Sequence, residues 1–305
     1  MSPDRRGQLL ILLAALLWST GGMCVKLLGD LGPWAVSGGR SALACLIFLA
    51  LLRGEVFPRR EQRRWVMAGA GIYAFVVTSY VVANLLTTAA NTIILQYTAP
   101  LWIALAGWTF IGVRPTAREL VSLTIGGTGV VLCLAPSLTL SVSSGSPSRA
   151  MLGDALALGS GVGFAALTIV LRKLSRSEHG NLTVELARAP LQCMFWGNLL
   201  AALIGAPALI GAGGAAPALS WLILVYLGLF QLGSGYWCFQ RGLRTTRALT
   251  ASLLNLIEPV LNPLWVALAV GEIPHAGTLF GGAAVLAAVV TLLLAPRRGN
   301  RTPGR

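Results

Sequence analysis

The chain has 305 residues, of which 55% are hydrophobic and only 11% are charged, and its formal net charge is +13. A soluble globular protein of this length needs many more charged side chains on its surface, and the mean hydropathy of +0.75 excludes that class. The basic residues lie in short clusters between apolar runs of about 20 residues, which is typical of membrane topology signals and argues against nucleic-acid binding. The sequence therefore predicts an all-α integral membrane protein.

Ten apolar stretches alternate with short polar connections along the chain. Arg5 and Arg6 precede the first stretch, which continues to about Leu28 without a convincing small-residue cleavage site. This pattern favours a retained membrane span over a cleaved signal peptide. The predicted spans cover residues 8–29, 33–53, 65–87, 91–111, 118–137, 150–173, 182–204, 217–240, 248–270 and 276–296.

The distribution of basic residues tests this assignment. Nineteen of the 23 Lys and Arg residues fall on one side of the membrane, Arg149 alone falls on the other, and Lys26, Arg40 and Arg188 lie within spans. Basic residues accumulate on the cytoplasmic side of membrane proteins, and an error in one span would scramble the bias. Ten spans with both termini cytoplasmic are therefore predicted, in a multi-pass protein of the plasma (inner) membrane.

The serine-rich stretch Ser137 to Ser148 divides the chain near its midpoint and is predicted to be an outward-facing loop. The predicted domains are a first five-helix repeat at 1–137, a linker at 138–149, a second five-helix repeat at 150–296 and a basic cytoplasmic tail at 297–305. Weak self-similarity links positions in the two halves, which pair as Trp18 with Phe164, Lys26 with Arg172, Arg40 with Arg188, Pro100 with Pro259, and Gly112 with Gly271.

Each half contains five spans, an odd number, so the second half must enter the membrane in the opposite orientation to the first. Two inverted five-helix repeats are typical of secondary transporters, whose substrate site lies near the bilayer midplane between the halves. Gene duplication without transport is the alternative.

The ninth span carries an unusual group of polar residues. A charged side chain at mid-bilayer depth costs about 2.5–3.5 kcal/mol, so Glu258 is expected to face protein or water. Asn255, Glu258 and Asn262 are spaced three and four residues apart and share one helical face. Pro259 and Pro263 disturb the backbone hydrogen bonds beside that face. The pattern favours a polar strip lining a central cavity; the alternative is a proline-kinked packing helix whose glutamate is satisfied by a neighbour.

Other polar residues within spans are also candidates. Arg40 needs a carboxylate, carbonyl groups or a substrate anion, and Lys26 either reaches the outer surface or has a function. Arg188 can pair with Glu185, which favours a structural role. Aromatic residues with amides suit a solute with apolar and polar parts, although Tyr and Trp also form interfacial belts. The predicted substrate pathway contains Trp18, Ser19, Arg40, Tyr80, Asn84, Gln96, Tyr97, Pro100, Arg188, Gln192, Tyr236, Gln240, Asn255, Glu258 and Asn262.

Several motifs resemble the drug/metabolite transporter superfamily, specifically its ten-helix EamA-type branch, over essentially the whole chain. These motifs are Trp18-Ser19, Arg40, Tyr97-Thr-Ala-Pro100, Gln240-Arg241-Gly-Leu243, Ile257-Glu258-Pro259-Val260 and Gly271-Glu272. One departure is Gly112-Val113, where the family usually carries Gly-Glu, so a cap or ion pair at the inner end of the fourth span is not expected. The resemblance implies a transporter of small metabolites, often an exporter, and does not identify the solute.

The predicted function is secondary active transport of a small organic metabolite, such as an amino acid, a related metabolite or a drug-like compound, by alternating access. Export is expected, with a small-molecule substrate and the lipid bilayer as partners, in a monomer or homodimer. Glu258 is the candidate for proton coupling, and the alternatives are that it binds a cationic group of the substrate or only hydrogen-bonds a neighbouring helix. An enzyme is not predicted, because the sequence has no HExxH or GxSxG motif and no histidine within a span. No cofactor, metal or ATP-binding loop is indicated. The alternative is a transport-inactive membrane sensor or a channel.

Overall fold

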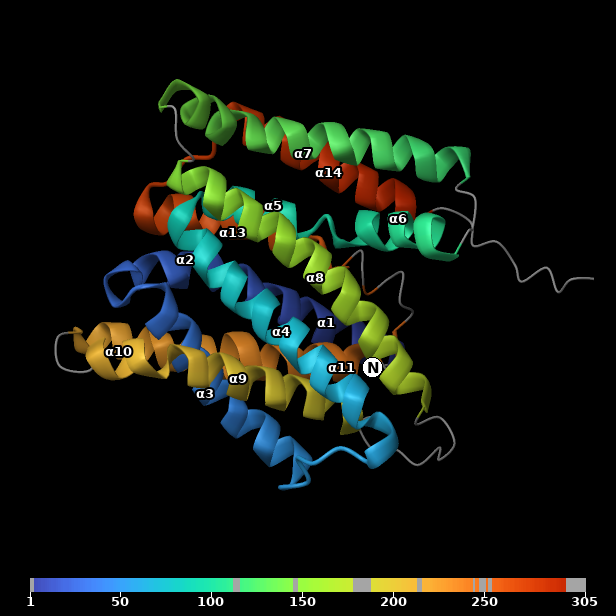
Figure 1. Cartoon of the computed structure of the whole chain (residues 1–305), viewed down its shortest axis with the longest axis vertical. Helices are drawn as coiled ribbons and strands as arrows, with labels where there is room; N and C mark the ends of the chain where they lie inside the picture. Colours follow the sequence, from blue (N-terminus) through green and yellow to red (C-terminus); the bar gives the residue numbers. More distant parts are fainter. Residues whose placement is uncertain are drawn as a thin grey trace, which may run out of the picture.

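The computed structural model describes residues 3–111, 116–144, 148–177, 188–212, 216–243, 245–246, 251 and 254–294, and every regular element within these ranges is helical (Figure 1). The first half contains α1 (Pro3–Ser19), α2 (Gly21–Leu27), the short 3-10 helix η1 (Gly29–Leu31), α3 (Pro33–Leu52), α4 (Arg60–Leu86), α5 (Ala89–Gln96), α6 (Ala99–Ile111) and α7 (Ala117–Ser144). The second half contains α8 (Arg149–Ser177), α9 (Arg188–Ala212), α10 (Ala218–Val225), the π-helix η2 (Tyr226–Ser234), α11 (Gly235–Leu243), α13 (Ile257–Val270) and α14 (Ala276–Leu293).

These helices follow the predicted membrane spans closely. Within the described residues, eight helical stretches are long and apolar enough to cross a membrane, and Ile257–Val270 and Ala276–Leu292 are shorter apolar helices. The 14-residue α13 extends only about 21 Å at 1.5 Å per residue, less than the hydrocarbon core of about 30 Å. The structure therefore supports a multi-pass helical membrane protein, while the count of ten spans stays a prediction.

Two predicted boundaries are wrong. α7 continues to Ser144, through most of the stretch predicted as a loop, because hydroxyl groups there bond back to the preceding turn: Thr139 donates to the Ala135 carbonyl at 3.0 Å and Ser141 to the Ser137 carbonyl at 2.8 Å. α9 extends to Ala212 rather than ending at 204, although it contains Pro207, because Gly205 and Leu209 pack against Gly38 and Gly39 of α3. The predicted tail at 297–305 lies outside the described residues.

The helices form a bundle with two clear edges (Figure 1). α7 and α14 lie side by side at one edge, and α3 packs against α9 near the other. Glycine makes the first contact possible, because a Cβ at Gly281 would lie 2.6 Å from the Gly129 carbonyl oxygen. Between the edges, α1, α2, α4, α5 and α13 surround the polar residues of the ninth predicted span.

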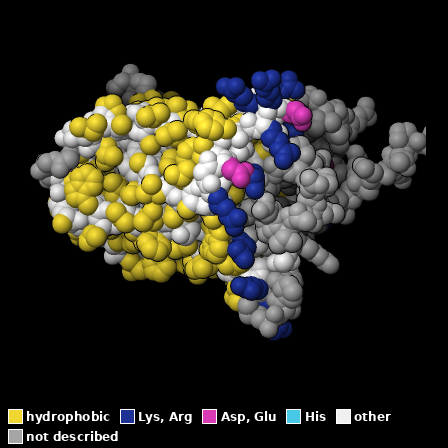
Figure 2. Space-filling model, turned by 90° about the horizontal axis from the view of Figure 1, so that it is seen from below, with side chains coloured by type: hydrophobic (Ala, Val, Ile, Leu, Met, Phe, Trp, Pro, Cys, Tyr) yellow, Lys and Arg dark blue, Asp and Glu magenta, His cyan; other side chains and the backbone are white. Residues whose placement is uncertain are grey.

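Successive membrane-length stretches run in opposite directions, so their connections gather at two ends of the bundle (Figure 1). At the end that we call the arginine end, α3 stops before Arg53 and α4 begins at Arg60. At the opposite end, the Lys26 end, α2 terminates beside Lys26, α4 meets α5 at Thr87, and Glu272 follows α13. Figure 2 shows Lys and Arg side chains gathered in a belt on the side where α4 begins, next to a broad hydrophobic surface.

Candidate functional site

The centre of the candidate site is a break between two helices of the first half. α5 ends at Gln96 and α6 begins at Ala99, so Tyr97 and Thr98 lie between them. Pro100 stands in the first turn of α6, where its missing N–H costs nothing because the first amides of a helix have no partner in any case. The proline therefore favours a new helix start at this point and leaves Tyr97 at the break.

Tyr97 joins the break to α13 in the second half. Its hydroxyl donates to Oε2 of Glu258 at 2.6 Å and also lies 2.9 Å from the carbonyl oxygen of Asn255. Glu258 is only 8% exposed and stands in the first turn of α13, where the helix dipole favours a negative charge. The carboxyl group of the predicted polar strip is therefore hydrogen-bonded by Tyr97, which belongs to the first half of the chain.

Asn262 extends the strip by one turn. It is fully buried, and its amide donates to the Tyr80 hydroxyl of α4 at 3.3 Å. A Cβ at Gly22 would lie 2.4 Å from Asn262 Oδ1, and a Cβ at Gly21 would lie 2.8 Å from Gln231 Nε2. The two glycines at the start of α2 therefore let α2, α4, α13 and η2 meet around this strip.

Aromatic rings form one wall of the site. Trp18 at the end of α1 contacts Tyr236 with ring centroids 5.0 Å apart, and Tyr236 contacts Tyr73 at 5.7 Å. On the other side of α1, Trp265 of α13 donates its indole N–H to the Ser19 hydroxyl at 3.0 Å. Such contacts provide an apolar surface beside a carboxyl group, as a site for a small organic solute requires.

Arg40 brings a second buried charge to the same region. Its side chain is 2% exposed, its Nη2 donates to the Val77 carbonyl at 2.6 Å, and its guanidinium lies 5.7 Å from the centroid of the Tyr80 ring. The carbonyl partner is one of those predicted for this residue. Tyr80 connects this charge with the polar strip, because its ring faces Arg40 and its hydroxyl accepts from Asn262, one turn beyond Glu258.

Several buried polar atoms around the strip have no hydrogen-bond partner among the residues that the structure describes. Leaving such an atom unpaired costs about 1–3 kcal/mol, so a group of them in one place is typical of a ligand site. The atoms are Trp18 Nε1, Arg40 Nε, Gln231 Oε1, Asn255 Oδ1 and Asn262 Oδ1.

The structure divides the predicted pathway residues into two groups. The residues that meet in the central region are Trp18, Ser19, Arg40, Tyr80, Tyr97, Tyr236, Asn255, Glu258 and Asn262. Pro100 shapes the break beside them, and Asn84 lies one turn from Tyr80, donating to its carbonyl at 2.9 Å. Gln96 donates to Ser160 at 2.7 Å, and Gln240 lies 3.6 Å from the Met194 sulfur, so these two amides connect helices.

Arg188 and Gln192 lie at the arginine end. Arg188 forms an ion pair with Glu55, and Gln192 donates to the carbonyls of Glu55 at 2.9 Å and Phe57 at 3.1 Å. These contacts hold the connection between α3 and α4 against α9, which is the structural role favoured for Arg188. The partner is Glu55, however, and the predicted partner Glu185 lies outside the described residues.

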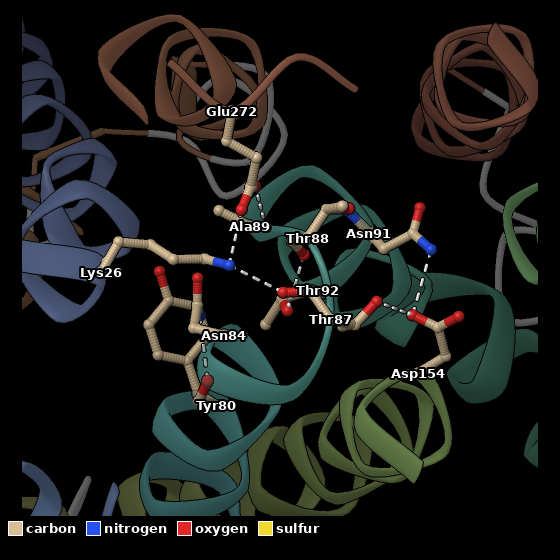
Figure 3. A network of polar contacts seen from close by, with 10 residues as sticks. All are labelled: Lys26, Tyr80, Asn84, Thr87, Thr88, Ala89, Asn91, Thr92, Asp154 and Glu272. Carbon is tan, nitrogen blue, oxygen red and sulfur yellow. Dashed lines mark hydrogen bonds and ion pairs between the residues drawn. The ribbon is translucent and has the colours of Figure 1, made fainter. Parts of the chain in front are cut away.

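Two residues of the polar core do not belong to the predicted substrate pathway. Gln231 belongs to a π-helix, and π-helical turns often occur at functional sites but leave no pattern in the sequence. Asp154 is fully buried in α8 and accepts hydrogen bonds from Ser137 at 2.6 Å, Thr87 at 2.7 Å and Asn91 at 3.0 Å; Figure 3 shows the last two. The rule that singled out Glu258, an acid within an apolar span, would also have found Asp154.

Comparisons with known proteins agree with the motifs. The family model for EamA-like transporters matches residues 5–135 and again residues 151–294. An uncharacterized transporter of Archaeoglobus fulgidus is 27% identical over 292 residues, which cover 94% of this chain and 96% of the relative. Solute carrier family 35 member G1 of Homo sapiens is 22% identical over 292 residues, covering 92% of this chain and 76% of the relative.

A solved structure titled only "Crystal structure of protein" shares the fold, with a TM-score of 0.56 at 20% identity over 93% of this chain and 95% of that one. The two family matches together span most of the described bundle, including the break at Tyr97 and the strip on α13. The chain belongs to the EamA-like transporter family.

Proposed function

We propose that this chain is a secondary active transporter that exports a small organic metabolite across the plasma membrane by alternating access of two inverted repeats. The arginine end faces the cytoplasm in this proposal, in agreement with the positive-inside rule. Family membership and the two successive family matches support a carrier built from two copies of one module.

The hydrogen bond between Tyr97 and Glu258 is the observation that carries the proposal. It joins a helix break in one half to a buried carboxyl group in the other, at the place where unpaired polar atoms gather. A carrier needs its site between two bodies that move relative to each other, because the site must be exposed to one side of the membrane at a time. A packing contact within one half would not have this property.

Proton coupling follows from the two acceptors of the Tyr97 hydroxyl. When Glu258 is ionised, the single hydroxyl hydrogen of Tyr97 goes to its carboxylate. When Glu258 carries a proton, it can donate that proton to the Tyr97 oxygen, and the Tyr97 hydrogen turns to the Asn255 carbonyl. Both protonation states therefore keep a satisfied hydrogen bond, as a group that loads and releases protons requires.

The surroundings define the class of solute. Trp18 and Tyr236 provide an apolar wall, while Glu258 and the neighbouring amide oxygens receive hydrogen-bond donors. An amino acid, a related metabolite or a drug-like compound with both parts fits this chemistry.

The test is flux of a panel of labelled solutes into proteoliposomes, with and without a proton gradient. Glu258→Gln is expected to abolish the response of flux to the proton gradient, because a glutamine amide does not take up or release protons near neutral pH. Glu55→Gln at the arginine end is expected to retain that response. Flux that persists with its gradient dependence in Glu258→Gln would remove the coupling role. A channel would instead give flux that does not saturate with solute, and a transport-inactive sensor would give solute binding without flux.

A further inference from the structure

The Lys26 end is closed by an ion pair that joins the two halves (Figure 3). Lys26 Nζ lies 2.6 Å from Oε2 of Glu272 and donates to the Thr87 carbonyl at 2.8 Å. The second carboxylate oxygen, Oε1 of Glu272, accepts from the backbone N–H of Ala89 at 2.7 Å. Each charged group therefore has the other charge and one backbone group as partners, and we call Lys26, Thr87, Ala89 and Glu272 the latch.

The surroundings make the latch stronger than an ordinary surface pair. The side chains of Lys26 and Glu272 are 16% and 22% exposed, so solvent screens them less than it screens a fully exposed pair. The Glu272 carboxylate also lies next to Ala89, the first residue of α5, where the positive end of the helix dipole attracts a negative charge.

The latch connects the elements that carry the candidate site. Lys26 lies on α2, which packs against Asn262 through Gly22. Ala89 begins α5, which ends at the Tyr97 break, and Glu272 follows α13, which carries Glu258. The site cannot open toward the Lys26 end while α2, α5 and α13 are held together, so the latch must release in each cycle.

In the sequence of the first half, the position that corresponds to Glu272 lacks the acid. The internal repeat pairs Lys26 with Arg172 and Gly271 with Gly112, so the position that matches Glu272 is Val113. A valine side chain cannot accept a hydrogen bond or pair with a cation. The residue types therefore allow this ion pair in one half-cycle only.

We propose that the Lys26–Glu272 latch biases the carrier toward the state closed at the Lys26 end, and that the internal repeat provides no second copy of this latch, because Val113 stands at the position that matches Glu272. This inference rests on the proposed function, because it needs two alternating states. A contact made in only one of two states shifts their ratio by the free energy of that contact. We expect the ratio of the two states to change by about fivefold or more when the latch is lost.

Hydrogen–deuterium exchange of the full chain in lipid nanodiscs tests the proposal. Lys26→Gln is expected to speed exchange about fivefold or more in residues 26–32 and 87–92, and at the same time to slow exchange in residues 5–11 and 239–246 at the arginine end. The slower exchange at the arginine end is the decisive result. If the latch only stabilised its own end locally, its loss would speed exchange at the Lys26 end and leave exchange at the arginine end unchanged. Lys26→Arg retains the charge and is the matched control.

Val113→Glu provides an independent variant that leaves the latch untouched. The internal repeat pairs this position with Glu272 and Arg172 with Lys26, so a carboxylate here restores the residue types of the latch in the other half. Exchange is therefore expected to rise at the distant Lys26 end, and Val113→Gln is the uncharged control. Faster exchange confined to the Lys26 end in Lys26→Gln, or no change there in Val113→Glu, would overturn the proposal. If solute is transported but the exchange effect is confined to the Lys26 end, the latch proposal is refuted and the transport proposal stands. If exchange changes reciprocally at the two ends but no solute is transported, the transport proposal is refuted and the two alternating states remain supported.

Discussion

The two ends of the bundle each carry an ion pair between the halves, and the two pairs differ in their surroundings. At the Lys26 end, the lysine and the carboxylate are sheltered and also bonded to backbone groups of Thr87 and Ala89. At the arginine end, Arg188 and Glu55 are 44% and 58% exposed. Exposed pairs contribute about 0–1 kcal/mol, because water and salt screen them and two long side chains lose freedom.

The same difference extends to the hydrogen bonds behind each pair. Asp154 lies close to the latch and fastens α8 to α4, α5 and α7 through Thr87, Asn91 and Ser137. At the arginine end, the connection between α3 and α4 is held by Gln192 and by Trp196, whose indole N–H donates to the Val56 carbonyl at 2.8 Å. Closure at the Lys26 end is thus formed by buried polar groups of both halves, whereas the charges of the arginine end lie at the surface.

Removing Asp154 is expected to have the largest effect. Asp154→Ala leaves the Thr87 hydroxyl without its acceptor in a buried place and takes one partner each from Asn91 and Ser137. The free energy of unfolding is expected to fall by about 3 kcal/mol. Thermal unfolding in nanodiscs measures this change, and Glu55→Ala, at the exposed pair, is the control with an expected loss of less than about 1 kcal/mol. Equal losses in the two variants would contradict the difference between the ends.

A smaller effect is expected from a single methyl group on α2. Gly22→Ala places a carbon 2.4 Å from Asn262 Oδ1, so the amide must move and its bond to Tyr80 must lengthen or break. Overpacking of this kind costs about 1–3 kcal/mol, and solute flux is expected to fall because α2 and α13 separate. Gly29 begins the 3-10 helix η1 after α2 and has nothing within 4 Å of its Cβ position, so Gly29→Ala is the control. Comparable loss of flux in both variants would refute a specific role for the α2–α13 contact.

Much of the fold followed from the sequence because a bilayer permits few solutions. Apolar runs of sufficient length must become helices in lipid, so most predicted spans correspond to helical stretches. The predicted element boundaries were wrong where local side-chain contacts determine whether a helix continues. Thr139 and Ser141 satisfy their hydroxyls within the helix, so the serine-rich stretch remains helical to Ser144. The π-helix around Gln231 depends on packing that no sequence pattern records.

The candidate site was predictable only in part, for a related reason. The cost of burying a charge identifies Glu258 from sequence alone, and the spacing of Asn262 places it on the same face. The identity of each partner depends on which helices meet. Tyr97 reaches Glu258, and Lys26 reaches Glu272, only after two halves distant in sequence have packed together. The sequence therefore indicates which buried polar groups need partners, whereas the identity of each partner depends on tertiary packing.

The smallest effect is expected at Arg188, and it decides between the two roles weighed for this residue. If Arg188 only holds the connection between α3 and α4, Arg188→Gln should lower the free energy of unfolding by less than about 1 kcal/mol and leave flux close to that of Glu55→Gln, which breaks the same ion pair. Flux and thermal unfolding are measured on both variants in the same vesicles. Because the two substitutions remove one contact from opposite sides, any loss of flux peculiar to Arg188→Gln cannot come from that contact. Such a loss in a well-folded variant would show that the guanidinium has a role in transport beyond its ion pair with Glu55.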